Sequence, residues 1–228
     1  MSATVTRIAI VGARGRLGTR ITALAAPRED VSVVATLGRT DADPEGGVDV
    51  VIDVSGAAGA ARAIALADRL GAPLLQASTG LAARDQADAE ALATRVAVLH
   101  APNLSPGVTM LHHLVREAVA RLPEGWTIEI VEAHHAGKVD APSGTALALA
   151  ASAGAGGRAV SPERIRSVRD GEIIGEHELI LTGPMETVRL RHEAGSRDLF
   201  AVGGIEAARW LHGRPPGRYR MDDVLAGT

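Results

Sequence analysis

The run from Glu132 to Ala146 carries more reactive side chains than any other part of the chain. It reads E-A-H-H-A-G-K-V-D-A-P-S-G-T-A, and so places two imidazoles, one ammonium group and two carboxylates within one short segment. An imidazole exchanges protons near neutral pH, and an ammonium group binds carboxylates. The run therefore has the groups needed to hold a small dianionic substrate and to move protons on it.

The flanking residues predict a strand before this run and a helix after it. Residues 126–132 alternate between apolar and polar types, whereas residues 145–150 are strong helix formers and Pro142 suits a first helical turn. The reactive groups are thus expected on a loop that faces a helix N-terminus. Unpaired backbone N–H groups and the helix dipole favour an anion there, and Lys138 would add to a cationic pocket for a dicarboxylate.

The two adjacent histidines are expected to have different roles. Neighbouring residues of an extended chain point in opposite directions, so His134 and His135 cannot easily do the same job. Three simpler interpretations compete: structural histidines, a metal site, or a helix cap formed by residues 140–143. Adjacent histidines followed by lysine give poor ligand geometry, so no metal is expected, and a helix cap is compatible with carboxylate binding.

A second motif, near the N-terminus, indicates a dinucleotide site. Glycines at positions 12, 15 and 18 follow an apolar strand predicted at residues 6–11 and precede a predicted helix at residues 19–26. Such a loop lets the backbone approach a pyrophosphate closely at a helix N-terminus. The expected cofactor contacts in this loop are Gly12, Ala13, Arg14, Gly15, Arg16 and Leu17.

The end of the next predicted strand, residues 31–37, bears on the choice of cofactor. An acidic residue there would bind the ribose 2′-hydroxyl of NAD, whereas an arginine accommodates the 2′-phosphate of NADP. Arg39 follows this strand, and we hypothesise that Arg39, helped by Arg14 or Arg16, favours NADPH over NADH. Three solvated surface arginines are the competing interpretation.

Strands that alternate with helices over the first hundred residues predict an α/β fold. We expect a Rossmann-like parallel-sheet domain formed by residues 1–104 and 205–228, because residues 205–211 are predicted to be a helix that returns to it. Residues 105–204 are expected to form a second α+β domain, built on a mixed sheet, for substrate binding and oligomerisation.

Composition narrows the class of protein further. A net charge of −3 gives no general reason to bind nucleic acid or membrane, and no apolar stretch is long enough to span a bilayer. The chain has no cysteine, which excludes dehydrogenases that pass through a cysteine thioester. No signal peptide is recognisable at the N-terminus, so a cytoplasmic protein is expected.

The run E-x-H-H-x-x-K-x-D-A-P-S-G-T-A resembles the signature of the 4-hydroxy-tetrahydrodipicolinate reductase (dihydrodipicolinate reductase) family. The resemblance implies that His134 is the proton donor and acceptor and that Lys138 is a further proton donor. It also implies that His135, Gly144 and Thr145 contact the substrate.

Two further loops resemble cofactor loops of this family, although both depart from its pattern. Residues 77–80 read A-S-T-G where the family has G-T-T-G, and residues 101–104 read A-P-N-L where it has A-P-N-F. The resemblance implies cofactor contacts from Ala77, Ser78, Thr79, Ala101, Pro102, Asn103 and Leu104. These departures leave the position of the nicotinamide less well defined than the substrate chemistry.

The resemblance implies NAD(P)H-dependent reduction of a cyclic hydroxy-dicarboxylate with loss of water, in lysine and diaminopimelate biosynthesis, by a homotetramer. Two alternatives stay open: a related imine or amino-acid dehydrogenase, and a catalytically weak nucleotide-binding sensor. The altered cofactor loops favour the interpretation as a sensor. A sensor, however, has no need of the proton donors His134 and Lys138.

Overall fold

The chain forms two compact units. The structure is a computed structural model that describes residues 5–227; the first unit runs to Ser105 and resumes at Asp198, and the second is Pro106–Arg197. The boundary expected at residues 204 and 205 falls inside one helix, Asp198–Leu211 (α6). This helix belongs entirely to the first unit, where Phe200 and Ala201 near its start pack into the core.

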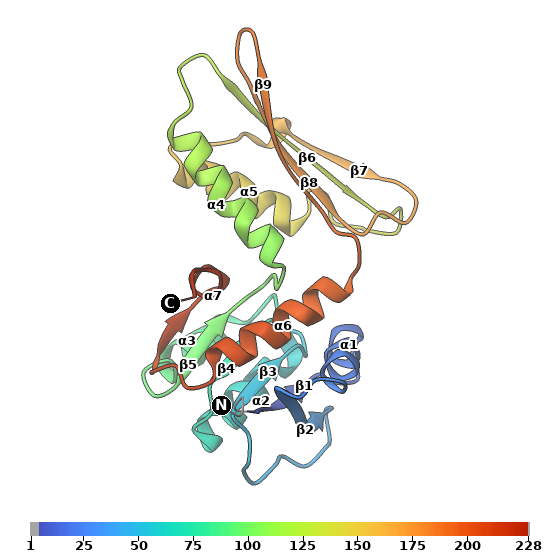
Figure 1. The fold of residues 1–228 in the computed structure, drawn as a ribbon, viewed down its shortest axis with the longest axis vertical. Helices are drawn as coiled ribbons and strands as arrows, with labels where there is room; N and C mark the ends of the chain where they lie inside the picture. Colours follow the sequence, from blue (N-terminus) through green and yellow to red (C-terminus); the bar gives the residue numbers. More distant parts are fainter. Residues whose placement is uncertain (1–4, 228) are drawn as a thin grey trace. The chain divides into compact units, whose positions relative to one another are not determined.

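A six-stranded parallel sheet forms the centre of the first unit (Figure 1). Its strands are β1 (Thr6–Val11), β2 (Val31–Leu37), β3 (Val50–Asp53), β4 (Leu74–Gln76), β5 (Ala97–His100) and β10 (Gly217–Tyr219), in the order β10-β5-β4-β3-β1-β2. The inner strands are buried on both faces, which explains their nearly continuous apolar sequences.

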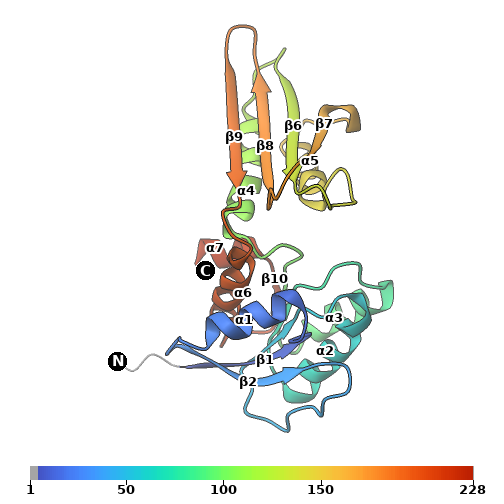
Figure 2. The ribbon, with the colours of Figure 1, turned by 90° about the vertical axis from the view of Figure 1, so that its right-hand side faces the viewer.

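Helices cover both faces of this sheet (Figure 2). α1 (Arg16–Ala25) and α6 pack on one face, and α2 (Ala57–Leu70) and α3 (Ala83–Leu92) on the other; α7 (Met221–Ala226) ends the unit. α2 ends at Gly71, whose φ of 60° is the left-handed conformation that terminates helices.

The strand order places a ligand crevice next to β1. β1 pairs with β2 on one side and with β3 on the other, so the chain leaves β1 and β3 toward opposite faces. In open α/β sheets, ligands bind at this topological switch point, beyond the carboxyl ends of the strands. The loops that follow β1, β2 and β3 therefore border the expected cofactor crevice.

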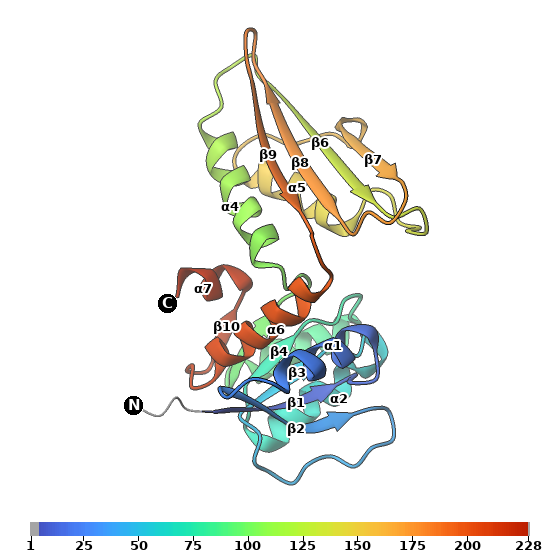
Figure 3. The same cartoon turned by 45° about the vertical axis from the view of Figure 1, so that its right-hand side comes forward.

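The second unit is a four-stranded mixed sheet with two helices on one face (Figure 3). Its strands are β6 (Thr127–His134), β7 (Ile165–Arg169), β8 (Glu176–Thr182) and β9 (Thr187–Glu193), in the order β7-β6-β8-β9. β7 runs parallel to β6 and the other pairs are antiparallel. The helices α4 (Pro106–Ala120) and α5 (Gly144–Ala155) bury Leu111, Val115 and Leu149 against this sheet; a short 3₁₀ helix, η1 (Pro162–Arg164), precedes β7.

The expected fold class, a Rossmann-like parallel sheet with a second unit on a mixed sheet, is confirmed. The sequence pattern did not predict β7 or β10, which are short strands at sheet edges and contain arginines. Within residues 5–227, no helix has the length and apolar character required to cross a membrane.

Candidate active site

His134 is the last residue of strand β6, rather than part of the loop on which it was expected. Glu132 lies two residues earlier and so projects from the same face of the strand. Its side chain is fully buried, and its Oε2 accepts a hydrogen bond from His134 Nδ1 at 2.5 Å. Because Nδ1 is engaged by the carboxylate, Nε2 is the nitrogen of His134 left for proton transfer.

Glu132 also binds the end of the neighbouring strand and the start of the next helix. Arg169, at the end of β7, donates to both carboxylate oxygens, with Nη1 at 3.0 Å and Nη2 at 2.7 Å. The backbone N–H of Ser143 donates to Oε1 at 3.3 Å. One buried carboxylate therefore fixes His134, Arg169 and the N-terminus of α5 relative to one another.

Electrostatics keep this carboxylate ionised. Burial disfavours the charge of Glu132, but hydrogen bonds from Arg169, Ser167 and His134 outweigh burial and hold its pKa at about 2. Burial lowers the pKa of His134, and Glu132 offsets part of that effect. The imidazole is therefore set to exchange a proton rather than to stay permanently charged.

The loop after β6 brings Lys138 to the same end of the sheet. Lys138 Nζ donates to Asp140 Oδ1 at 2.7 Å, and its side chain is mostly shielded from solvent. Arg169 donates to the backbone carbonyl of Asp140, so the guanidinium that holds Glu132 also holds this loop. Lys138 and His134 are thus connected through the Glu132–Arg169 pair.

Helix α5 begins beside this loop. Ser143 is its N-cap, and its hydroxyl accepts the backbone N–H of Ala146 at 3.2 Å. Pro142 precedes the cap, so its expected place in the first helical turn is wrong. Gly144 and Thr145 form that first turn, where the helix dipole favours an anionic group.

His177 and Gly175 line the other side of the His134 ring. The rings of His177 and His134 meet edge to face, with centroids 5.2 Å apart. A Cβ at Gly175 would lie 3.3 Å from His134 Nε2, so a larger residue there would crowd the imidazole. His135, the other predicted substrate contact, is half-buried, and its backbone carbonyl accepts the N–H of Lys138.

The glycine-rich loop of the first unit has the close packing that a dinucleotide site requires. Gly12 has a φ of 90°, and a Cβ on it would lie 2.6 Å from the backbone of Ser55. A Cβ on Gly18 would lie 2.4 Å from the carbonyl oxygen of Gly12. α1 starts after Gly15, which provides no side-chain cap, so this helix end can bind a phosphate through its backbone.

A cavity of about 690 Å³ opens at the switch point. Of the predicted cofactor residues, Gly12, Arg14, Gly15 and Arg39 line it, together with Val54, Ser55 and Arg62, which were not predicted. Its size, the glycine loop and the arginines fit a nicotinamide dinucleotide.

The other predicted cofactor residues do not line this cavity. Ala13, Ala101 and Leu104 are buried in the core, and Leu17 and Ala77 pack against it. The Ser78 hydroxyl accepts the backbone N–H of Gly56 at 2.9 Å, and the Asn103 side chain accepts the N–H of Ser105 at 2.9 Å. The remaining three residues, Arg16, Thr79 and Pro102, are exposed.

Glu132, Arg169 and His177 had no assigned role in the sequence interpretation. Glu132 ends the predicted strand, and only the extension of β6 to His134 places these two side chains, two residues apart, on one shared face. The partners Arg169 and His177 come from strands more than thirty residues further along the chain, so spacing could not reveal them. Within residues 5–227, no group of three metal-binding side chains is arranged to hold an ion.

A dinucleotide-binding parallel sheet and a mixed-sheet unit with a carboxylate–histidine pair define the class of two-domain, dinucleotide-dependent oxidoreductases. Two family models match the chain: "Dihydrodipicolinate reductase, N-terminus" over residues 6–104 and "Dihydrodipicolinate reductase, C-terminus" over residues 107–225. The chain belongs to the dihydrodipicolinate reductase family, which confirms the resemblance seen in its sequence.

Similar proteins extend over the whole chain. The 4-hydroxy-tetrahydrodipicolinate reductase of Xanthomonas campestris pv. campestris is 40% identical, over 99% of this chain and 100% of its own length. That of Caulobacter vibrioides is 39% identical over 96% of both chains.

Solved structures support the fold. A dipicolinate-bound dihydrodipicolinate reductase from a Paenisporosarcina species superposes with a TM-score of 0.82 at 21% identity, covering 95% of this chain and 98% of the other. An engineered D-amino acid dehydrogenase bound to NADP⁺ gives a TM-score of 0.58 at 17% identity, covering 97% and 96%.

Proposed function

We propose that this protein reduces 4-hydroxy-tetrahydrodipicolinate to tetrahydrodipicolinate, with loss of water and oxidation of NAD(P)H, in lysine and diaminopimelate biosynthesis. The observation that carries the proposal is the buried Glu132–His134 pair beside Lys138 and the N-terminus of α5. Family membership over the whole chain supports the same reaction.

The protein supplies the protons and the orientation for this reaction. When bound, the reduced dinucleotide supplies the hydride for one carbon of the conjugated ring that forms when water is lost. His134 delivers a proton from Nε2 to the neighbouring carbon, because Glu132 engages Nδ1. Lys138 protonates the hydroxyl that leaves as water, and its positive charge stabilises negative charge that develops on the ring.

The substrate is a dianion, and the second unit offers cationic and backbone groups to bind it. Gly144 and Thr145, in the first turn of α5, bind one carboxylate through the backbone, and His135 orients the ring. The relative from Paenisporosarcina was solved with dipicolinate, which supports a cyclic dicarboxylate as the class of substrate.

The cofactor site favours NADPH in this proposal. Arg39 and Arg14 line the cavity beyond β2, and a guanidinium matches the geometry of a 2′-phosphate. Parallel kinetics with NADPH and NADH test this preference, and a clear preference for NADH would refute it.

The open face of the second unit's sheet supports a homotetramer. Val131 and Ile180 are half-buried and stand on the face away from α4 and α5, next to the Arg189–Glu178 ion pair. We propose that the homotetramer assembles through this sheet in the cytoplasm, and light scattering on the purified protein would measure its mass.

The direct test is a nicotinamide absorbance assay with enzymatically generated 4-hydroxy-tetrahydrodipicolinate. The proposal predicts turnover with this dicarboxylate and none with plain amino acids. Turnover of amino acids alone would indicate a related dehydrogenase, and dinucleotide binding without any turnover would indicate a sensor.

A further inference from the structure

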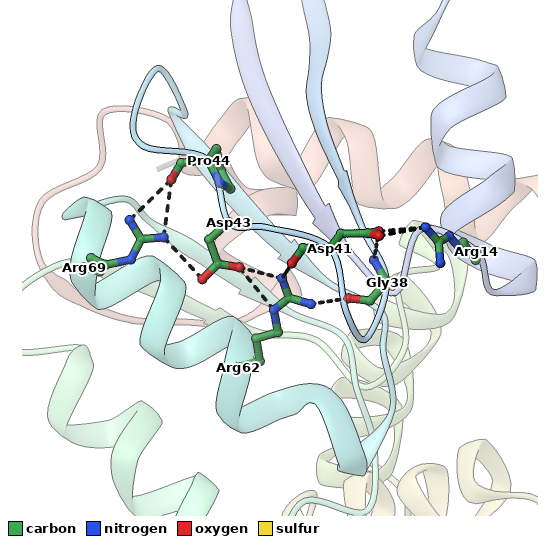
Figure 4. A network of polar contacts seen from close by, with 7 residues as sticks. All are labelled: Arg14, Gly38, Asp41, Asp43, Pro44, Arg62 and Arg69. Carbon is green, nitrogen blue, oxygen red and sulfur yellow. Dashed lines mark hydrogen bonds and ion pairs between the residues drawn. The ribbon is translucent and has the colours of Figure 1, made fainter.

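The end of strand β2 lacks the acidic side chain that usually binds a ribose. Gly38 occupies that position, directly after Leu37. Asp41 folds back on it, and its Oδ2 accepts the backbone N–H of Gly38 at 2.8 Å (Figure 4). A Cβ placed on Gly38 would lie 3.3 Å from this Oδ2. The Asp41 carboxylate therefore occupies the space of the missing acidic side chain.

Arg14 of the glycine-rich loop meets the same carboxylate. Its Nη2 donates to both oxygens of Asp41, at 2.8 and 2.9 Å. The hydrogen bond from Gly38 lowers the pKa of Asp41, and Arg14 lowers it further, so the carboxylate is charged at neutral pH. In this arrangement, one of the arginines that would hold a 2′-phosphate is already neutralised.

Helix α2 holds the loop that carries Asp41. Arg62 donates to the backbone carbonyls of Gly38 and Asp41 and to Asp43 Oδ1, the last at 2.6 Å (Figure 4). Arg69 pairs with Asp43 on its other oxygen. The loop is thus fixed by the protein itself, so the position of Asp41 does not depend on a bound ligand.

Arg39 lies on the same loop and has no such partner. It lines the cavity, is exposed, and pairs with no carboxylate within residues 5–227. A 2′-phosphate would form an ion pair with Arg39 but would be repelled by the negative charge of Asp41. A 2′-hydroxyl could donate a hydrogen bond to that same carboxylate.

We propose that Asp41 is the carboxylate that selects between the two nicotinamide dinucleotides. It accepts the ribose 2′-hydroxyl of NAD(H) and neutralises Arg14, and so opposes the preference for a 2′-phosphate that Arg39 confers. This inference rests on the proposed function only for the presence of a dinucleotide. In the wild-type protein it narrows the preference for NADPH over NADH without reversing it.

The test is calorimetric titration of the full chain with NADP⁺ and NAD⁺, and with the fragments 2′,5′-ADP and 5′-AMP. These titrations measure affinity, so they do not require turnover. Asp41→Asn keeps the shape of the side chain and an acceptor for Gly38, but removes the charge. Asp43→Asn is the matched control, because Asp43 lies on the same loop and pairs with Arg62 and Arg69 instead of Arg14.

In Asp41→Asn we expect the ratio of NADP⁺ to NAD⁺ affinity to rise about tenfold or more, the usual effect of one charged hydrogen bond. The ratio of 2′,5′-ADP to 5′-AMP affinity should rise in the same way. Asp43→Asn should change the ratio of NADP⁺ to NAD⁺ affinity by less than about twofold. If Asp41→Asn does not fold, Asp41→Ser, whose hydroxyl can accept the Gly38 N–H, should give the same shift.

Several results would overturn the inference. An unchanged ratio in the Asp41 variants, or an equal loss of both affinities, would make Asp41 a merely structural residue while leaving the proposed reductase intact. An equal shift in Asp43→Asn would assign the effect to the loop as a whole. Failure of the wild type to bind either dinucleotide would refute the cofactor assignment as well.

Discussion

Replacing Glu132 by glutamine tests whether this carboxylate organises the active site. The substitution keeps the size of the side chain but removes a fully buried charge that Arg169 contacts with two hydrogen bonds. Breaking a buried ion pair on one side costs about 3–5 kcal/mol, and Arg169 keeps some access to water, so we expect about 3 kcal/mol of stability to be lost.

Activity should fall more than stability alone would explain. The hydrogen bond to Glu132 raises the pKa of His134 against the effect of burial, so its loss lowers the protonated fraction at neutral pH. The imidazole also loses the partner that fixes its orientation. We expect kcat to fall on the order of 10²-fold, the usual contribution of a proton-transfer group.

Two measurements separate these effects, namely denaturant unfolding and the pH dependence of kcat on folded protein. The control is Glu129→Gln on the same strand, since Glu129 forms an exposed pair with Arg164 and should change stability by less than about 1 kcal/mol. A Glu132→Gln protein with wild-type stability, a kcat within threefold of wild type and an unshifted pH profile would refute the reasoning.

Two further predictions concern neighbouring groups. Lys138→Met should lower kcat on the order of 10²-fold without changing dinucleotide affinity, because Lys138 belongs to the second unit. Steady-state kinetics measure kcat and calorimetry measures the dinucleotide affinity. An unchanged kcat would exclude Lys138 as a proton donor. Burial lowers the pKa of His177 from 6.5 to about 4, so the folded state binds fewer protons than the unfolded state. Its contribution, on the order of 3 kcal/mol, is therefore complete above pH 6.5 and is lost as the pH falls toward 4. Thermal melting between pH 7 and 4 should show a weaker pH dependence in His177→Gln, and an equal dependence in both proteins would contradict this origin.

The sequence predicted the parts of the fold that depend on local patterns. Buried parallel strands such as residues 6–11 appear as apolar runs, and the helix predicted at residues 19–26 corresponds to α1, which begins three residues earlier, at Arg16. The alternation of residues 126–132 does not continue to position 134, so the pattern predicts a loop where β6 still continues.

Contacts between distant segments could not be predicted in this way. The Glu132–Arg169 pair joins residues 37 positions apart, and Arg62 holds the β2–β3 loop from a helix 24 residues after Gly38. Asp41 replaces an acidic residue three positions earlier only because its loop folds back on the Gly38 N–H. The rule that places the ribose-binding acidic residue directly at the end of β2 therefore does not identify Asp41.

The most direct test of the account is the kcat of His134→Gln with enzymatically generated 4-hydroxy-tetrahydrodipicolinate, measured alongside its dinucleotide affinity. Glutamine can form hydrogen bonds but cannot transfer a proton at neutral pH. The account predicts a kcat at least about 10²-fold below wild type with unchanged dinucleotide affinity. A kcat within threefold of wild type would contradict it, because the imidazole would then not be the proton donor.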